Sequence, residues 1–405
     1  MIGKPRIIIL MHYLELGGAE ISLIGLLQAL DPTIVDVDLF IYSHQGPLMK
    51  YIPEWVNLLP EKMPYSIIER PIAEALKNYQ FGVVAGRLLS KIKHRKYLKK
   101  KKVNPALDAS IFQFVADCTT PLLPNINPEI EYDLCISFLT PHNIGRDKVK
   151  AKKKLAWIHT DYSTISVNAE QELPVWNSYD YIASISPDVT NSFLSTFPSL
   201  KNKIIEIENI ISPEFIRKRA NVFSVEKEIP KTEHTINLLS IGRFSHPKNF
   251  DNLPDIVKRI LANGIVNLKW YIIGFGGEEQ LIRSKIKETG MENHVILLGK
   301  KDNPYPYIKA CDIYVQPSRY EGKSITVREA QILGKPVVIT NYPTASSQVR
   351  DGYEGVIVPL DNNGCAKGIV DFILNAPLQK EIVSNLSKND YGNFAEVEKI
   401  YSILN

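Results

Sequence analysis

The chain contains 405 residues, of which 44% are apolar and 23% are charged, and it carries a formal net charge of +4. A single hydrophobic core stops growing beyond about 250–300 residues, so this length predicts two domains. Because acids nearly balance bases, any basic surface for a partner has to be local. The cysteines lie far apart without a C-x-x-C pair, which argues against a zinc site or a disulfide framework and fits a reducing cytoplasm.

The N-terminal segment is expected to be a buried strand and not a membrane element. No stretch approaches the about 18 apolar residues that a membrane-spanning helix needs. Residues Ile7 to Met11 are apolar but few, and Glu15 and Glu20 follow them with no small-residue cleavage site between. We therefore expect a strand here, within a protein that has no transmembrane span.

A glycine pair follows this strand and precedes a leucine-rich helix. Gly17 and Gly18 at a strand-to-helix turn would let a phosphate approach backbone N–H groups. A turn that needs only a positive φ angle explains the same glycines equally well. The next strand, Val35 to Tyr42, contains Asp36 and Asp38, and its alternation predicts that both acids face solvent and bind no metal.

A dense basic segment runs from Arg87 to Lys102, with nine lysines and arginines and no acid. Leu88, Leu89, Ile92 and Tyr97 give it a partial apolar face. Each basic residue near an anionic membrane leaflet contributes about 1 kcal/mol, so the segment predicts an anionic membrane surface as a partner. A solvated basic helix is the alternative, and nucleic acid is not expected because no stacking or groove-reading module accompanies the charge.

The remaining strands of the first half lead to a histidine. Strands are expected at Asp133 to Leu139, Leu155 to Asp161, Tyr181 to Ser186 and Ile204 to Asn209. His159 comes at the end of the second of these, where an imidazole can contact a hydroxyl or a developing charge. A structural histidine is the alternative. Residues 210–235 are largely polar and predict a linker between domains.

The second half repeats the strand-and-helix rhythm from Ile236 to Ile241. Arg243 and Lys248 lie on the loop after this strand, where a guanidinium and an ammonium group could hold a diphosphate. They could equally be solvated surface cations. Further on, Gly276 belongs to a glycine-rich turn that enters a helix, which is weak evidence for a nucleotide on its own.

The segment from Arg319 to Thr340 combines a loop acid, a helical acid and a buried strand. Glu321 precedes the helix and Glu329 lies in its first turns, so both carboxylates can meet sugar hydroxyls at one sheet edge. Between them, backbone N–H groups at a helix N-terminus favour an anion such as a diphosphate; the residues concerned are Lys323, Ser324, Ile325 and Thr326. Alternatively, Thr326 caps the helix, Glu329 closes a capping box, and Glu321 is a solvated loop acid.

The Glu-x7-Glu spacing of Glu321 and Glu329 resembles the donor-site signature of the retaining nucleotide-sugar glycosyltransferases of family four. The G-R-x4-K spacing of Arg243 and Lys248 resembles that family's phosphate-binding pair. The resemblance implies an α/β fold of the GT-B type, with two doubly wound Rossmann-like domains facing a central cleft. These would be residues 1–209 with a returning C-terminal helix 386–405, and a donor domain 236–385. Family members often have Phe after Glu-Gly where this chain has Lys323, so the donor sugar is not carried over.

The resemblance also implies roles for these residues. Arg243 and Lys248 would neutralise the departing diphosphate, Glu321 would hold the sugar, Glu329 would hold the ribose, and His159 would contact the donor sugar. The expected reaction moves a hexose from a nucleoside diphosphate sugar, with UDP the favoured nucleotide, to an acceptor hydroxyl with retention. No cofactor is required. The acceptor is expected to be a saccharide or lipid-linked saccharide of cell-envelope or capsular polysaccharide assembly, at the inner membrane face. Alternatives are a non-catalytic nucleotide-sugar-binding protein, or a GT-B epimerase or phosphorylase.

Overall fold

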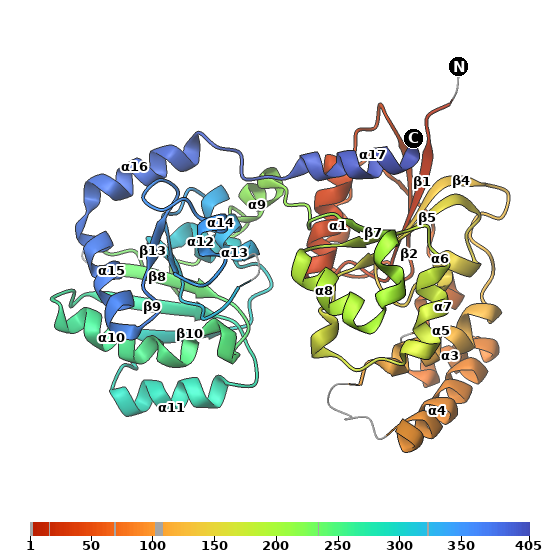
Figure 1. The fold of residues 1–405 in the computed structure, drawn as a ribbon, viewed down its shortest axis with the longest axis horizontal. Helices are drawn as coiled ribbons and strands as arrows, with labels where there is room; N and C mark the ends of the chain where they lie inside the picture. Colours follow the sequence, from red (N-terminus) through yellow and green to blue (C-terminus); the bar gives the residue numbers. More distant parts are fainter. Residues whose placement is uncertain (1–2, 16, 69, 102–107, 234, 322–323) are drawn as a thin grey trace. The chain divides into compact units, whose positions relative to one another are not determined.

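The computed structural model describes residues 3–15, 17–68, 70–101, 108–233, 235–321 and 324–405. The chain forms two compact units, each built on a parallel sheet (Figure 1). Unit 1 contains residues 1–212 and 393–405, and unit 2 contains residues 213–392. Two α/β units with parallel sheets agree with the two doubly wound domains that the sequence predicts.

The sheet of unit 1 has the strand order β3-β2-β1-β4-β5-β6-β7, and neighbouring strands are parallel. The first strand therefore lies inside the sheet, and the order reverses between β1 and β4. The strands are β1 Arg6–Met11, β2 Asp36–Ile41, β3 Asn57–Leu58, β4 Tyr132–Ser137, β5 Ala151–Ile158, β6 Tyr181–Ser184 and β7 Ile204–Glu206. The apolar run Ile7 to Met11 is at most 1% exposed, as expected for a strand covered on both faces.

Helices cover the sheet of unit 1. They are α1 Gly18–Ala29, α2 Met63–Ser66, α3 Ile72–Lys77, α4 Phe81–Lys101, α5 Ser110–Thr119, α6 Asn143–Asp147, α7 Ala169–Asn177, α8 Pro187–Thr196 and α17 Glu398–Leu404. Figure 1 shows α4 lying beside α5, with which it makes extensive contacts. The C-terminal α17 belongs to this unit, and the backbone N–H of Asp31 donates a hydrogen bond to the hydroxyl oxygen of Tyr401 at 2.7 Å.

The sheet of unit 2 repeats this topology with the order β10-β9-β8-β11-β12-β13. Its strands are β8 Ile236–Ile241, β9 Leu268–Ile273, β10 Val295–Gly299, β11 Ile313–Gln316, β12 Val337–Thr340 and β13 Val356–Val358. Its helices are α9 Pro213–Arg219, α10 Leu253–Ala262, α11 Glu279–Thr289, α12 Tyr305–Ala310, α13 Ile325–Ile332, α14 Ala345–Gln348, α15 Asn362–Leu374 and α16 Ala376–Ser387. The order of this sheet reverses between β8 and β11.

The segment 210–235, predicted as a linker, is largely part of unit 2. It contains α9, which packs against α12 and α13. Phe215 and Ile216 of this helix are 3% and 1% exposed, so they bury apolar surface in that unit. A polar stretch thus hides a short amphipathic helix, because only a few of its residues carry the packing.

Two local expectations in unit 1 are wrong. Asp38 does not face solvent, because it is 2% exposed and accepts hydrogen bonds from Arg6 at 2.9 Å and from the Tyr132 hydroxyl at 2.6 Å. In the interior of a parallel sheet both strand faces are covered, so alternation does not identify a wet face. Tyr97 does not belong to the exposed apolar face of α4, because its ring packs against the ring of Phe114 at a centroid distance of 5.5 Å.

Candidate active site

The loops that follow β8 and β11 bring the predicted ligand-binding residues of unit 2 together. The chain runs outward from β8 to β10 and returns to β11, so the strand order reverses between these two loops. Open parallel sheets bind ligands outside the carboxyl ends of their strands at such a reversal. Arg243 and Lys248 belong to the first loop and Glu321 to the second.

Lys248 and Glu321 form a close ion pair across the reversal. The Lys248 Nζ atom lies 2.6 Å from Oε1 and 2.9 Å from Oε2 of Glu321. Glu321 is 8% exposed, and its Oε1 also accepts hydrogen bonds from Gln316 at 3.0 Å and Ser318 at 2.7 Å. A carboxylate with three donors is held in one orientation. Glu321 is therefore not the solvated loop acid of the alternative interpretation.

The backbone of the two loops is also joined. Asn249 has a φ of 61°, a conformation that asparagine tolerates, and its amide donates to the Pro317 carbonyl at 2.9 Å. The Arg319 N–H donates to the Pro247 carbonyl at 2.8 Å, and its guanidinium binds both carboxylate oxygens of Asp251 at 2.8 and 2.9 Å. These bonds fix the positions from which Lys248 and Glu321 extend.

Arg243 differs from Lys248 in being exposed. Its side chain forms no hydrogen bond or ion pair with the part of the chain that the structure describes. A guanidinium in this position offers its full set of donors to a ligand. The structure thus places one bound and one available cation on the same loop.

Gly276 has a packing reason to be glycine. A Cβ atom there would lie 2.4 Å from the Phe244 carbonyl oxygen, and one at Gly274 would lie 1.9 Å from the Gly242 carbonyl oxygen. The loop after β9 therefore presses its backbone against the loop after β8. The predicted contact of Gly276 with a donor stays a prediction.

The helix α13 does not begin with a capping box. Its N-cap is Ser324, without a side-chain cap, while the Thr326 hydroxyl bonds the Tyr314 hydroxyl at 2.7 Å. The Ser324 N–H donates to Gln348 at 3.0 Å. Ile325 is 39% exposed at the start of the helix, and its backbone N–H belongs to the first turn, where intrahelical acceptors are lacking. Lys323 lies outside the described residues.

Glu329 is buried on α13 and has its own partner. It is 6% exposed, and one carboxylate oxygen accepts a hydrogen bond from the Tyr305 hydroxyl at 2.9 Å. Burial raises the pKa of Glu329 to about 7. Such an acid is readily protonated near neutral pH, and it could exchange hydrogen bonds with a polar ligand group. The family resemblance implies that the Asn303-Pro304-Tyr305 loop lies near the base, but the hydrogen bond between Tyr305 and Glu329 was not predicted, because these residues meet only in the fold.

Two further predicted positions lie in unit 1. His159 directly follows β5, and its ring packs against Phe138 at a centroid distance of 4.7 Å and is stacked on Trp157 at 5.9 Å. Burial lowers the pKa of His159 to about 3, so the imidazole is neutral at physiological pH. A neutral imidazole can donate one hydrogen bond and accept another, but it carries no positive charge.

The Gly17-Gly18 turn lies at the N-terminus of α1. Gly17 is the N-cap with an extended φ of −119°, so the alternative based on positive φ does not hold. A Cβ at Gly17 would lie 2.2 Å from Oε2 of Glu20, whose carboxylate folds back over this turn. Burial raises the pKa of Glu20. Glu20 occupies the third helical position, where the acid of a capping box lies, but Gly17 has no side chain with which to complete such a box.

Comparison with known proteins finds similar sequences and structures. Residues 223–389 match the family described as glycosyl transferases group 1, and this segment lies within unit 2. An uncharacterized glycosyltransferase of Methanocaldococcus jannaschii is 27% identical over 286 residues, which cover 64% of this chain and 70% of the relative. The solved structure of Anabaena HepE in complex with UDP and glucose matches with a TM-score of 0.60 and 17% identity, covering 99% of each chain.

A third relative has a more specific name. The N-acetylgalactosamine-N,N'-diacetylbacillosaminyl-diphospho-undecaprenol 4-alpha-N-acetylgalactosaminyltransferase of Campylobacter jejuni is 30% identical over 145 residues. These residues cover 35% of this chain and 39% of the relative. The fold is GT-B, and the matches support the glycosyltransferase superfamily for this chain.

Among the described residues, no helix combines the length and apolarity that crossing a bilayer requires.

Proposed function

We propose that this protein is a retaining hexosyltransferase of family four, which moves a sugar from a nucleoside diphosphate sugar to an acceptor hydroxyl. UDP is the proposed nucleotide, since HepE is described in complex with UDP and glucose. The observation that carries the proposal is the Lys248–Glu321 ion pair at the strand-order reversal of unit 2. Glu321 stands eight residues before Glu329, which is also buried.

In this proposal, the cations of the β8 loop stabilise the leaving group. The bond between the anomeric carbon and the diphosphate oxygen breaks, and negative charge develops on that oxygen. Arg243 and Lys248 neutralise it in place, which is effective because preorganised charges need no rearrangement during the reaction. The acceptor oxygen forms the new bond on the same face of the sugar, and its proton passes to the departing phosphate.

The carboxylates position the donor. Glu321 is held by Gln316, Ser318 and Lys248, and it would accept hydrogen bonds from sugar hydroxyls without moving. Glu329 would accept hydrogen bonds from the ribose and share them with the Tyr305 hydroxyl. Within unit 2, the backbone N–H groups of Ile325 and Thr326 in the first turn of α13 would add donors to the diphosphate. The expected contacts of Gly17, Gly18 and His159 with the donor stay predictions.

An assay for transfer tests this proposal. The protein is incubated with UDP-glucose, UDP-N-acetylglucosamine or the GDP and ADP sugars, with and without lipid-linked saccharide acceptors. We expect a product heavier by one hexose-type unit, with the anomeric configuration of the donor by proton NMR. Isomerised or phosphorolysed donor would favour an epimerase or phosphorylase, and donor binding without release of nucleotide would favour a non-catalytic protein.

The surface of α4 supports a lipid-linked acceptor at an anionic membrane. Leu88, Leu89 and Ile92 are 50%, 46% and 53% exposed on this helix. They lie among lysines and arginines of the same 21-residue helix. Apolar side chains that enter the headgroup region, together with cations that attract anionic lipid, hold amphipathic helices on membranes. Leu88, Leu89 and Ile92 together form the α4 face.

A further inference from the structure

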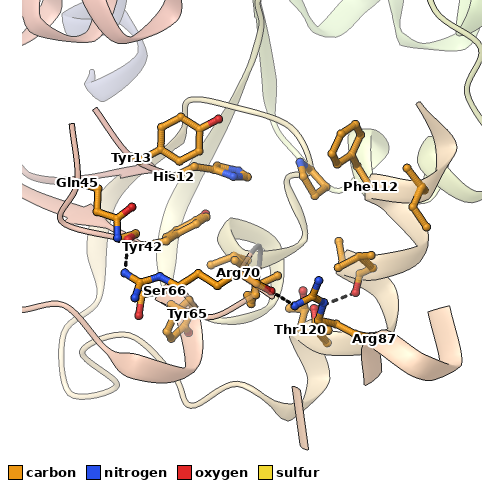
Figure 2. A pocket seen from close by; sticks show the side chains of 18 residues that line it. His12, Tyr13, Tyr42, Gln45, Tyr65, Ser66, Arg70, Arg87, Phe112 and Thr120 are labelled. Atoms are coloured by element: carbon orange, nitrogen blue, oxygen red, sulfur yellow. Dashed lines mark hydrogen bonds between the residues drawn. The ribbon is translucent and has the colours of Figure 1, made fainter. Parts of the chain in front are cut away.

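In unit 1, two arginines line a cavity of about 420 Å³ beside the carboxyl ends of β1, β2 and β4 (Figure 2). Their side chains are held by neighbouring parts of that unit. Arg70 pairs with Glu74 at 2.8 Å and donates to the Ser43 hydroxyl at 3.0 Å, and Arg87 donates to the backbone carbonyl of Arg70. Arg219 of unit 2 is more deeply buried than either, and its contacts lead to the candidate active site.

Arg219 is the last residue of α9 and is 6% exposed. A buried guanidinium is costly unless its donors are satisfied, so its contacts show what holds it. Its Nη2 donates to the Asp302 carbonyl at 3.2 Å, and its Nε donates to the side-chain oxygen of Asn303 at 3.4 Å. The Asn303 amide donates in return to the Arg219 carbonyl at 2.9 Å. These bonds fix the loop that follows β10.

The same guanidinium lies against two aromatic rings. Its carbon is 5.6 Å from the ring centroid of Phe215 and 6.0 Å from that of Tyr305, the distance at which a cation is attracted to a ring face. Tyr305 is 1% exposed and is the first residue of α12, directly after Asp302, Asn303 and Pro304. Arg219 therefore contacts both the loop that leads to Tyr305 and the ring of Tyr305 itself.

Tyr305 in turn holds Glu329. Among the described residues, its hydroxyl is the one that donates to the Glu329 carboxylate, at 2.9 Å. Glu321 differs, since Lys248, Gln316 and Ser318 all donate to it. A carboxylate with a single donor takes its orientation from the position of that donor. Moving Tyr305 would therefore turn Glu329.

We propose that Arg219 is a positioning residue for the sugar-nucleotide site. Through the loop at Asn303 and the ring of Tyr305, it places the hydroxyl that orients Glu329 toward the ribose. The inference rests on the proposed function, which assigns the ribose to Glu329. Preorganisation of this kind raises affinity because the ligand does not have to order the side chain that binds it.

Titration of UDP and of inorganic pyrophosphate into Arg219→Met by calorimetry tests this role. Methionine retains an apolar stem but has no donors. We expect UDP to bind about tenfold more weakly, which equals about 1.4 kcal/mol and lies in the range for residues of one hydrogen-bond network. Pyrophosphate lacks the ribose and should bind as it does to the wild type. Unchanged UDP affinity, or equal losses of both ligands, would overturn the proposal.

Two further variants of α9 show whether the effect belongs to this side chain. Arg219→Lys should restore part of the UDP affinity, because an ammonium group can still donate to the Asp302 carbonyl. Arg217→Met, which removes an exposed cation from the same helix, is the matched control and should change nothing. A loss in Arg217→Met as large as that in Arg219→Met would show a general effect of charge and would also overturn the proposal.

A double-mutant cycle tests whether Arg219 acts through Tyr305. Tyr305→Phe keeps the ring, removes the hydroxyl and should weaken UDP to a similar extent. The double variant should bind UDP about as weakly as either single variant, because both changes release the same carboxylate. Losses that multiply to about a hundredfold would show that the two residues act separately, against the proposal.

Asn303→Ala keeps the test decisive if Arg219→Met does not fold. It removes the side chain that bonds Arg219 in both directions and leaves the arginine in place. The same selective loss of UDP is expected, by a smaller factor. Unchanged UDP affinity in both Asn303→Ala and Arg219→Lys would rule out the positioning role.

The wild type separates this inference from the proposed function. If the wild type binds UDP and transfers sugar while Arg219→Met binds UDP equally well, the proposed function stands and Arg219 only stabilises the fold. If the wild type binds neither UDP nor pyrophosphate, the proposed function fails and the role of Arg219 fails with it.

Discussion

The two units share one backbone topology but differ in the chemistry at the reversal of strand order. In unit 2, the reversal between β8 and β11 carries the Lys248–Glu321 ion pair. In unit 1, the reversal between β1 and β4 lies beside an aromatic cavity with arginines at its edge. Parallel sheets provide the place for a ligand, and the loops after the strands determine which ligand it is. The predictions below test the sugar-nucleotide site proposed in unit 2 and two features of unit 1.

The largest effect is expected at the cations of unit 2. Arg243→Ala and Lys248→Ala should each lower kcat by about 10²–10³-fold, since each removes a preorganised charge next to the leaving group. Steady-state rates with a donor and acceptor pair measure this. Near-normal rates in correctly folded variants would contradict the proposed roles.

Stability should distinguish these two cations. Arg243 has no partner in the described chain, so its loss should leave the free energy of unfolding unchanged. Lys248→Ala leaves the buried Glu321 carboxylate without its cation and should cost about 1–3 kcal/mol, because Gln316 and Ser318 still donate. Urea denaturation measures both. Adding Glu321→Gln to Lys248→Ala should recover the stability but not the rate.

A pH-dependent effect is expected at Glu329. Its folded-state pKa of about 7 lies above the unfolded value of about 4.3, so the folded state binds the extra proton between these pH values. Ionisation therefore lowers stability as pH rises through this window. Glu329→Gln removes this cost and should raise the unfolding free energy above pH 7, by at most about 4 kcal/mol, with little change near pH 4. Denaturation at pH 4.5 and pH 8 tests this, and an equal difference at both would contradict it. The same variant should bind UDP more weakly.

The contrast between the units also shows what the sequence could predict. The strands of unit 2 follow from runs of apolar residues, and the family resemblance implied one site for Arg243, Lys248 and Glu321, but the Lys248–Glu321 ion pair was not predicted. The partners Gln316, Ser318 and Tyr305 did not follow, because they meet the carboxylates only through folding. In unit 1, the alternation of polar and apolar residues predicted that Asp38 faces solvent. Its strand is instead covered on both faces, and the Tyr132 hydroxyl, distant in sequence, donates a hydrogen bond to its carboxylate. Arg70 and Arg87 both line the cavity of unit 1, and no spacing in the sequence indicates this.

Binding to vesicles tests the α4 face of unit 1. Replacing Leu88, Leu89 and Ile92 together by serine should reduce flotation with anionic vesicles, since each loses about 1 kcal/mol of apolar insertion. Lys96→Ala should lose a similar amount on anionic vesicles only. If the wild type and the triple variant float with anionic vesicles to the same extent, the α4 face does not bind the membrane.

The smallest effect is expected for the protonation of His159. Burial lowers the pKa of His159 to about 3, so the pH profile of kcat between pH 6 and 8 should contain no step due to this residue. His159→Asn should alter the rate without altering the shape of that profile. A step near pH 6.5 that disappears in the variant would contradict a neutral imidazole.

Titration of UDP into wild-type protein and the Arg243→Ala variant by calorimetry tests the central claim that unit 2 holds a nucleoside diphosphate through the cations of its β8 loop. The account predicts saturable binding to the wild type and an affinity at least about tenfold lower in the variant, as expected for a lost charge-assisted contact. Equal affinity in the two proteins, or no binding of UDP, GDP or ADP to the wild type, would contradict it.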